Sequence, residues 1–170
     1  MKKPDVLFLF EYNYWATRLI LRAADGLSTE QFTAPARLSF GSLRGTLVHI
    51  LSTERIWRQR CQEGVSPSTM LQEAGYPDLA SLRLDMETEE REMRSYLASL
   101  ADDDLQRTIR YTNTRGFPYE NVLWQILAHV VNHGTQFRSE AGVGLTELGH
   151  SPGDVDLLFF MRQGGQIKLA

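Results

Sequence analysis

The spacing of apolar residues constrains this chain most, because these residues recur at three- and four-residue steps through several long stretches. A repeat close to 3.6 residues places side chains on one face of a helix. The pattern predicts amphipathic helices over four stretches: residues 5–24, 43–63, 78–100 and 118–144, the last fraying from about residue 142. Four such faces can bury one another, so we predict an all-α four-helix bundle.

Residues with strong capping preferences stand where these helices should begin and end. Ser28-Thr29-Glu30-Gln31 resembles a capping box and predicts one short helical turn. Ser42 is the expected N-cap of the second long helix and Gly64 its stop. Asp78 or Ser81 is the expected cap of the third. The helix ends thus agree with the apolar pattern.

The segments around the last long helix follow other patterns. Residues 106–118 alternate in side-chain type and turn at Arg115-Gly116, which predicts a short hairpin or an extended crossover. Pro118 is then the expected start of the last long helix. Further on, residues 155–161 predict a small apolar helix that covers one face of the bundle. We find no linker or repeat, so residues 1–170 are expected to form one domain.

Charge and hydropathy exclude several classes of partner. The net charge is -3, and no basic run extends beyond Lys2-Lys3, so neither nucleic acid nor an anionic membrane is an expected partner. The apolar stretch Val6 to Phe10 is too short for a signal peptide or a membrane span. We therefore expect a cytoplasmic protein.

Two polar features are expected to be structural. Cys61 is the single cysteine and lies in a charged run without an evident catalytic partner, which indicates a structural thiol. The acidic run Glu87 to Glu92 is expected to form a solvated helix face.

Three of the four histidines lie on predicted helices. His129 and His133 are four residues apart on the last long helix, so their Cβ atoms are expected about 5–6 Å apart on one side. His49 lies among apolar residues of the second helix and can face them from across the bundle. Three imidazoles suit zinc, nickel, copper or ferrous iron, and leave a coordination position for water or substrate. His150 lies in a turn and is expected either to cap the last long helix or to contact solvent.

A non-metal interpretation of these histidines also stands. Pairs spaced by four residues arise by chance, and a single His49 on an apolar face is often a hydrogen-bonded core residue. The sequence HVVNH lacks the glutamate of the HExxH zinc proteases. We find no G-x-S-x-G, GxGxxG or phosphate-binding Gly-Lys loop, which argues against hydrolase-fold, dinucleotide-binding and nucleotide-binding enzymes.

Several neighbours of the histidines have two interpretations. Gln136 and Glu140 could orient a water or a ligand imidazole, or make surface or interhelical contacts. Three aromatic residues could line a pocket or belong to the core: Tyr12, Trp15 and Trp57.

Three segments together resemble one known family. The first helix has the pattern Tyr-Asn-x-Trp-Ala at Tyr12, Asn13, Trp15 and Ala16. The second helix contains SFGSLRGTLVHILSTERIW with His49, and AHVVNHGTQFRSEAG followed by LGHSPGDVD ends the bundle. These segments resemble the DinB family of DinB/YfiT-like proteins. The resemblance implies a four-helix bundle, a homodimer, and a three-histidine site for nickel or zinc. It also implies a small-thiol substrate, because some relatives are thiol-dependent S-transferases or isomerases.

The chain departs from the family pattern at Phe137, where relatives often carry a further histidine. If the ligands on the last long helix correspond to His133 and position 137, two ligands remain and metal binds weakly or not at all. If they correspond to His129 and His133, the set with His49 is complete. The first function hypothesis is a metal-dependent thiol S-transferase, and the alternative is a non-catalytic bundle for interaction or small-molecule binding with a degenerate metal site. Apolar residues of the first helix and of residues 157–161 are the expected dimer surface.

Overall fold

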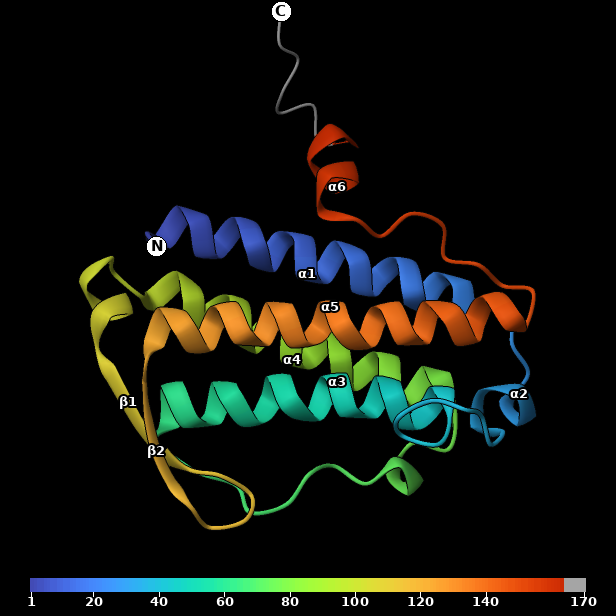
Figure 1. Ribbon diagram of the computed structural model, residues 1–170, viewed down its shortest axis with the longest axis horizontal. Coiled ribbons are helices and arrows are strands. Elements are labelled where there is room, and N and C mark those ends of the chain that lie inside the picture. Colours follow the sequence, from blue (N-terminus) through green and yellow to red (C-terminus); the bar gives the residue numbers. More distant parts are fainter. Residues whose placement is uncertain (164–170) are drawn as a thin grey trace, which may run out of the picture.

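Four long helices lie side by side in the computed structural model, which describes residues 1–163 (Figure 1). They are α1 (Lys3–Ala24), α3 (Leu43–Arg58), α4 (Leu79–Ser99) and α5 (Leu123–Glu147). The shorter elements are α2 (Thr29–Thr33), η1 (Gln59–Glu63), η2 (Glu73–Gly75), η3 (Asp103–Gln106), β1 (Thr108–Thr112), β2 (Pro118–Val122) and α6 (Leu157–Gln163). The predicted all-α bundle is therefore confirmed.

Helix α5 holds the bundle together, because it packs along both α1 and α3 (Figure 1). Its buried face interleaves with theirs, while α4 closes the opposite side against α3 and α1. The residues of α5 that are buried in this way include Ile126, Leu127, Val130, Val131, Phe137, Ala141 and Leu145. The apolar stripe of the sequence thus becomes the core, as its period indicated.

The predicted caps are present. Ser28 and Gln31 form the capping box of α2, with the Gln31 N–H donating to Ser28 Oγ at 3.3 Å. Ser42 Oγ accepts from the Gly45 N–H at 2.8 Å, and Asp78 Oδ1 accepts from the Ser81 N–H at 2.8 Å. Gly64, with φ at 70°, ends the π-helical turn η1 that extends α3. These contacts satisfy backbone groups that a helix end leaves unpaired.

The predicted start and end of the last long helix were both wrong. Pro118 begins β2, which pairs antiparallel with β1 from Thr112↔Pro118 to Thr108↔Val122. Proline is compatible both with the end of a two-stranded ribbon and with the first turn of a helix. Here the residues after Pro118 pair with β1, so the segment forms a strand. At the other end, α5 continues past its glycines to Glu147. At Gly144 a Cβ would stand 3.2 Å from Leu38, so the missing side chain permits a close contact with the loop before α3.

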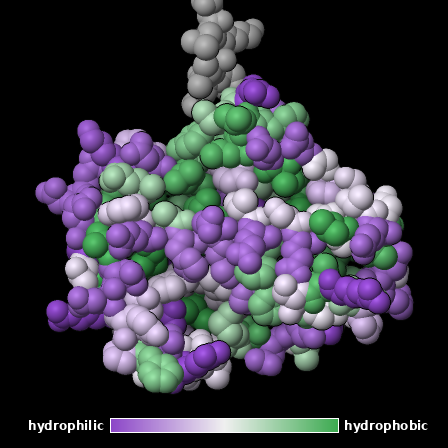
Figure 2. Space-filling view, viewed as in Figure 1, coloured by the Kyte–Doolittle hydropathy of each residue, from purple (hydrophilic) through white to green (hydrophobic). Residues whose placement is uncertain are grey.

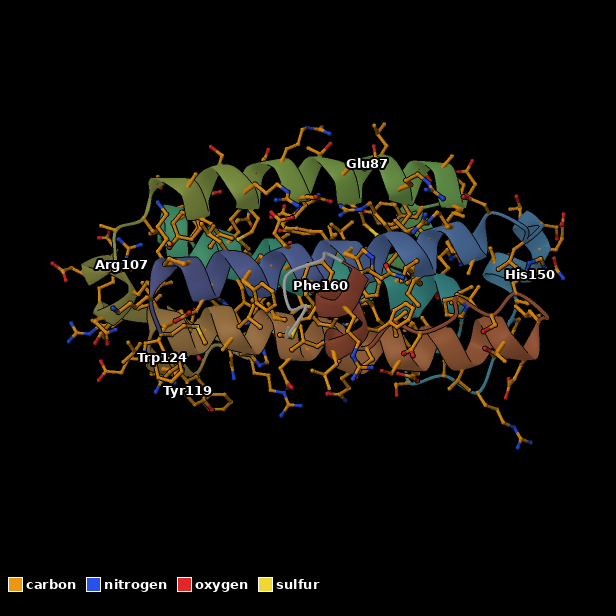
Figure 3. The ribbon with its side chains drawn as sticks, turned by 90° about the horizontal axis from the view of Figure 1, so that it is seen from above. Glu87, Arg107, Tyr119, Trp124, His150 and Phe160 are labelled. Atoms are coloured by element: carbon orange, nitrogen blue, oxygen red, sulfur yellow. The ribbon has the colours of Figure 1, made fainter. Side chains whose placement is uncertain are left out.

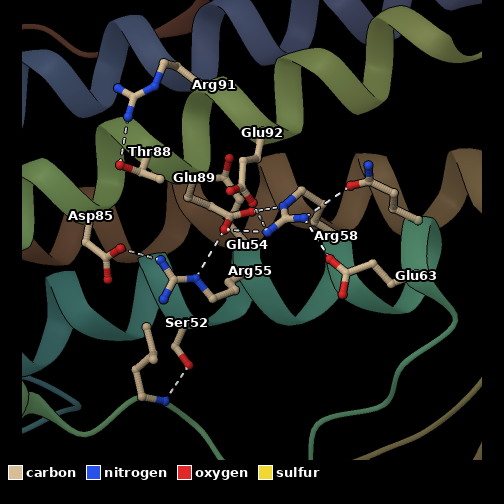
Figure 4. Close-up of polar contacts among 12 residues, drawn as sticks. Ser52, Glu54, Arg55, Arg58, Glu63, Asp85, Thr88, Glu89, Arg91 and Glu92 are labelled. Atoms are coloured by element: carbon tan, nitrogen blue, oxygen red, sulfur yellow. Dashed lines mark hydrogen bonds and ion pairs between the residues drawn. The ribbon is translucent and has the colours of Figure 1, made fainter.

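The acidic face of α4 is solvated only in part. Glu89 is 1% exposed, and Arg58 donates from Nε to its Oε1 at 2.5 Å and from Nη2 to its Oε2 at 3.2 Å (Figure 4). Arg55 Nε donates to the same carboxylate at 3.2 Å. The expectation of a fully solvated run was therefore wrong at Glu89, since two arginines one turn apart on α3 face this position.

Helix α6 stands outward from the bundle and contacts α1 (Figures 1 and 3). The Phe160 ring centroid lies 5.7 Å from that of Phe8 and 5.4 Å from that of Trp15. The small C-terminal helix was thus predicted correctly, two residues early at each end. Apolar atoms gather on the surface around α6 (Figure 2), and Leu158 is 56% exposed. A homodimer through this surface stays a prediction.

No helix within residues 1–163 is both long enough and apolar enough to cross a membrane.

Replacing Glu89 with glutamine is expected to destabilise the bundle by about 2 kcal/mol, because Arg55 and Arg58 then lose the one buried carboxylate that they share. Arg58 keeps only its ion pairs with the more exposed carboxylates of Glu63 and Glu92. Urea unfolding measures the change. The control is Glu120→Gln, whose partner Arg110 and own side chain are exposed at 85% and 62%, so a change below about 1 kcal/mol is expected. Similar losses in the two variants would contradict a stabilising role for the buried pair.

Candidate functional site

The site is built on two histidines from facing helices. His49 of α3 and His133 of α5 bring their Nε2 atoms to 3.0 Å, although 84 residues separate them in sequence. Thr53, one turn after His49, places its Oγ1 3.5 Å from His133 Nε2. Both imidazoles are half-buried. In the hydrogen bond between the rings, one Nε2 carries the proton and donates, and the other Nε2 accepts through its lone pair.

Aromatic side chains enclose this histidine pair. The Phe40 ring stacks on His49 with centroids 3.7 Å apart. The Phe137 ring lies 4.7 Å from the His49 ring and 4.6 Å from the His133 ring. The pair therefore faces carbon on these sides, and little water can solvate a charge on either ring.

The aromatic enclosure determines the protonation of both rings. Burial lowers the pKa of His49 to about 4, against the opposing charge of Glu140. Burial, together with the charges of His49, His129 and Arg138, lowers the pKa of His133 to about 3. Both imidazoles are thus neutral near pH 7, the form in which histidine binds metals.

His129 lies apart from this pair. Its side chain is exposed, its ring centroid is 5.7 Å from that of His133, and it packs edge-on against Trp57 at 5.5 Å. Position 137, in contrast, contacts both imidazoles. Within residues 1–163 no three His, Cys, Asp or Glu side chains come together as a metal site would require. Of the three predicted ligands, the structure brings together His49 and His133.

The arrangement fits two ligands of a transition-metal ion. Two imidazole nitrogens bound tetrahedrally to zinc at about 2.0–2.1 Å lie about 3.3 Å apart, so the 3.0 Å separation needs only a slight opening. Further donors are near the pair but do not converge on it: the Thr53 hydroxyl and His129. The Phe137 ring occupies the direction from which a third imidazole on α5 would approach.

Comparison with known proteins identifies the family. The family model described as "DinB family" matches residues 1–168. The chain belongs to the DinB family. It is also similar to a protein named Protein DinB from Bacillus subtilis (strain 168), with 25% identity over 165 residues that cover 90% of this chain and 92% of that protein.

A buried polar network joins α5 to α1 in this DinB-family protein. Arg138, 1% exposed, donates from Nη1 to Asn13 Oδ1 at 2.5 Å. A Cβ at Gly134 would stand 2.6 Å from Arg138 Nη1 and 2.7 Å from Asn13 Oδ1, so a larger residue there would displace these two side-chain ends. Arg138 was not predicted from the sequence, although Asn13 in the Tyr-Asn-x-Trp-Ala pattern was a signal for a buried polar partner.

The structure defines the contacts of the residues near the histidines that had two interpretations from the sequence. Glu140 accepts from the Ser39 N–H and so holds the loop before α3, whereas Gln136 is exposed. Trp57 lines a cleft of about 300 Å³ beside His129, together with Tyr111, Asn121, Gln125 and Ile126.

Other predicted residues belong to the framework. Tyr12 is buried and donates from its hydroxyl to the Val155 carbonyl at 3.1 Å, and Trp15 packs beneath α6. The His150 N–H donates to the Leu145 carbonyl at 2.9 Å and closes the end of α5, as expected of a cap. Burial raises the pKa of the Cys61 thiol to about 12, which agrees with a structural role.

In protein freed of metal by a chelator, acidification is expected to destabilise the fold through the histidine pair. The folded pKa values lie below the unfolded value of about 6.5, so the unfolded chain binds protons that the folded chain does not. This contribution to stability is complete above the unfolded value and is lost as the pH falls toward about 4 and 3.

Urea unfolding at several pH values between about pH 7 and pH 5 measures this dependence. The variant His133→Gln should show a shallower slope than the natural chain, and the control His150→Gln should keep it. An unchanged slope for His133→Gln would contradict the assignment.

Proposed function

We propose that this DinB-family protein binds a divalent transition-metal ion, zinc or nickel, and uses it in thiol transfer to a small-molecule substrate. The observation that carries the proposal is the 3.0 Å approach of His49 Nε2 and His133 Nε2 from two facing helices. Their lowered pKa values support it, because neutral imidazoles need not lose a proton to bind the ion. His129, whose ring centroid lies 5.7 Å from that of His133, is the candidate for a further nitrogen donor on α5, and it would have to turn toward the pair to bind the same ion.

The chemistry suits a reaction of thiols. When bound, a divalent ion acts as a Lewis acid and lowers the pKa of a coordinated thiol. The chain itself contributes a water-poor wall at Phe40 and Phe137, and the cleft beside Trp57 and His129 is large enough for a small substrate. A small thiol is therefore the proposed substrate class.

Metal binding is tested by equilibrium dialysis of tag-free protein against zinc. We expect close to one equivalent in the natural chain and its loss in His49→Ala and in His133→Ala, because each removes one of the two converging nitrogens. His129→Ala measures whether that side chain contributes. The matched control is His150→Ala, which should bind as the natural chain does. Binding that survives both His49→Ala and His133→Ala would refute the proposal.

A second candidate function is a non-catalytic bundle that binds a partner or small molecule. The contacts of Phe137 with both imidazoles favour it, since a carbon ring stands where a ligand would complete the site. In that case the histidine pair is a core hydrogen bond, and the dialysis above detects no bound zinc.

The variant Phe137→His is expected to tighten zinc binding by at least about tenfold, because even the loss of an outer-shell partner changes metal affinity by that order. Competition with a chromogenic chelator measures the affinity. The control Phe137→Leu opens similar space without adding a nitrogen and should not tighten binding. Equal affinities of Phe137→His and the natural chain would show that position 137 has no part in a metal site.

A further inference from the structure

A second cleft lies between α1, α3 and α4 and is not lined by any of the histidines. It measures about 320 Å³. Its apolar walls come from all three helices and include Leu21, Ile50, Leu51 and Met86. Two carboxyl groups, Glu54 and Glu89, reach it from the protein interior (Figure 4). Arginine and glutamate side chains line most of the rest of the cleft, so it joins an apolar wall to charged groups that can select a ligand by its charge.

The two buried carboxyl groups are compensated differently. Glu89 is bound by Arg55 and Arg58, as described above. Glu54 is 8% exposed, accepts from the Tyr14 hydroxyl at 2.5 Å and from Asn13 Nδ2 at 3.4 Å, and forms no ion pair within residues 1–163. A buried carboxylate without a directly bound cation is costly. The charge of Arg138, which is linked to Glu54 through Asn13, offsets that cost only in part.

The groups around Glu54 favour a proton on it over part of the neutral range. Burial raises its pKa to about 7, and the charge of Glu89 on α4 adds to this effect. The hydrogen bonds from Tyr14 and Asn13 on α1 and the charge of Arg138 on α5 oppose the increase. A cation placed beside Glu54 would therefore displace its proton.

The arginines at the rim do not make the cleft an anion site. Arg18 Nη1 lies 3.1 Å from Glu90 Oε1, and Arg83 forms an ion pair with Asp25. Arg22 is exposed to solvent. Since Arg18 and Arg83 already pair with carboxylates, negative charge dominates at depth, where solvent screens it least.

We propose that this cleft is a binding site for a small organic amine with an apolar body. The ammonium group pairs with the Glu54 carboxylate, and the apolar body packs against Leu21, Ile50 and Met86. When an ammonium ion binds while Glu54 is protonated, the carboxyl proton passes to solvent and the charges balance. The site shares no lining residue with the histidine pair, so it goes beyond the proposed metal function and is tested apart from it.

The test uses n-hexylamine as the probe and 1-hexanol as its neutral counterpart, with the full chain in isothermal titration calorimetry. We expect hexylammonium to bind at least about tenfold more tightly than hexanol, since a charge-assisted hydrogen bond strengthens binding by that order. In protein labelled with ¹³C-methyl methionine, the Met86 signal, assigned with Met86→Leu, should shift on titration. Equal affinities for the two probes, or an unmoved Met86 signal, would overturn the proposal.

Two matched variants test which carboxylate binds the ammonium group. Glu54→Gln keeps the side-chain shape and should abolish the preference for hexylammonium over hexanol. Glu87→Gln removes an exposed carboxylate from the outer side of α4 at the rim of the same cleft (Figure 3) and should retain that preference. Loss of the preference in Glu87→Gln with its retention in Glu54→Gln would place binding at the rim and refute a site at Glu54.

Proton release tests the natural chain without any variant. At about pH 6, hexylammonium binding should release close to one proton, measured from heats in two buffers of different ionisation enthalpy. At about pH 8 the release should be much smaller, because Glu54 is then already mostly ionised. Binding without proton release at the lower pH would contradict a role for the Glu54 carboxyl.

Discussion

The packing of α5 along both α1 and α3 is the constraint on which the histidine pair depends. The contact with α3 brings His133 to His49, and the contact with α1 brings Arg138 to Asn13. Gly134 lies next to His133 in the sequence and leaves room for the second of these contacts. A side chain at this position would displace the ends of the Arg138 and Asn13 side chains and disturb their hydrogen bond.

Charged residues of α3 make two different kinds of buried contact. Arg55 and Arg58 of this helix bind Glu89 of α4, whereas Glu54, one residue before Arg55, turns to Tyr14 of α1. The Glu89 cluster is complete within the chain, and breaking it is expected to cost stability. Glu54 has only neutral hydrogen-bond donors at contact distance, so its charge state can respond to what lies in the cleft.

The sequence was sufficient for features set by short-range chemistry. Helical period and capping residues located α1, α3 and α4 to within a few residues, because Ser42, Gly64 and Asp78 act within one turn. The sequence was insufficient where the structure of a segment depends on contacts with residues distant in the chain. The start of α5 depends on the pairing of β2 with β1, and the burial of Glu89 depends on two arginines of another helix.

The difference between short-range patterns and contacts with distant residues also explains which parts of the candidate site were predicted. The approach of His49 and His133 followed from apolar stripes on two helices, which sequence periodicity reveals. The separation of His129 did not, because residues four apart share only a broad side of a helix and the neighbouring helix decides which of them it meets. Here α3 meets Phe137, one turn after His133, and Trp57 meets His129, one turn before it.

The five-residue step from His49 to Glu54 explains how one helix can serve two sites. In an α-helix five residues correspond to a rotation of about 140°, so His49 turns toward α5 while Glu54 turns toward α1 and α4. The helix body separates the two groups, and each lies among different aromatic and charged neighbours. A neutral imidazole pair suited to a metal and a carboxyl group suited to a cation can therefore occupy one small bundle. Their different surroundings keep the two imidazoles neutral near pH 7, where the carboxyl is close to its pKa of about 7.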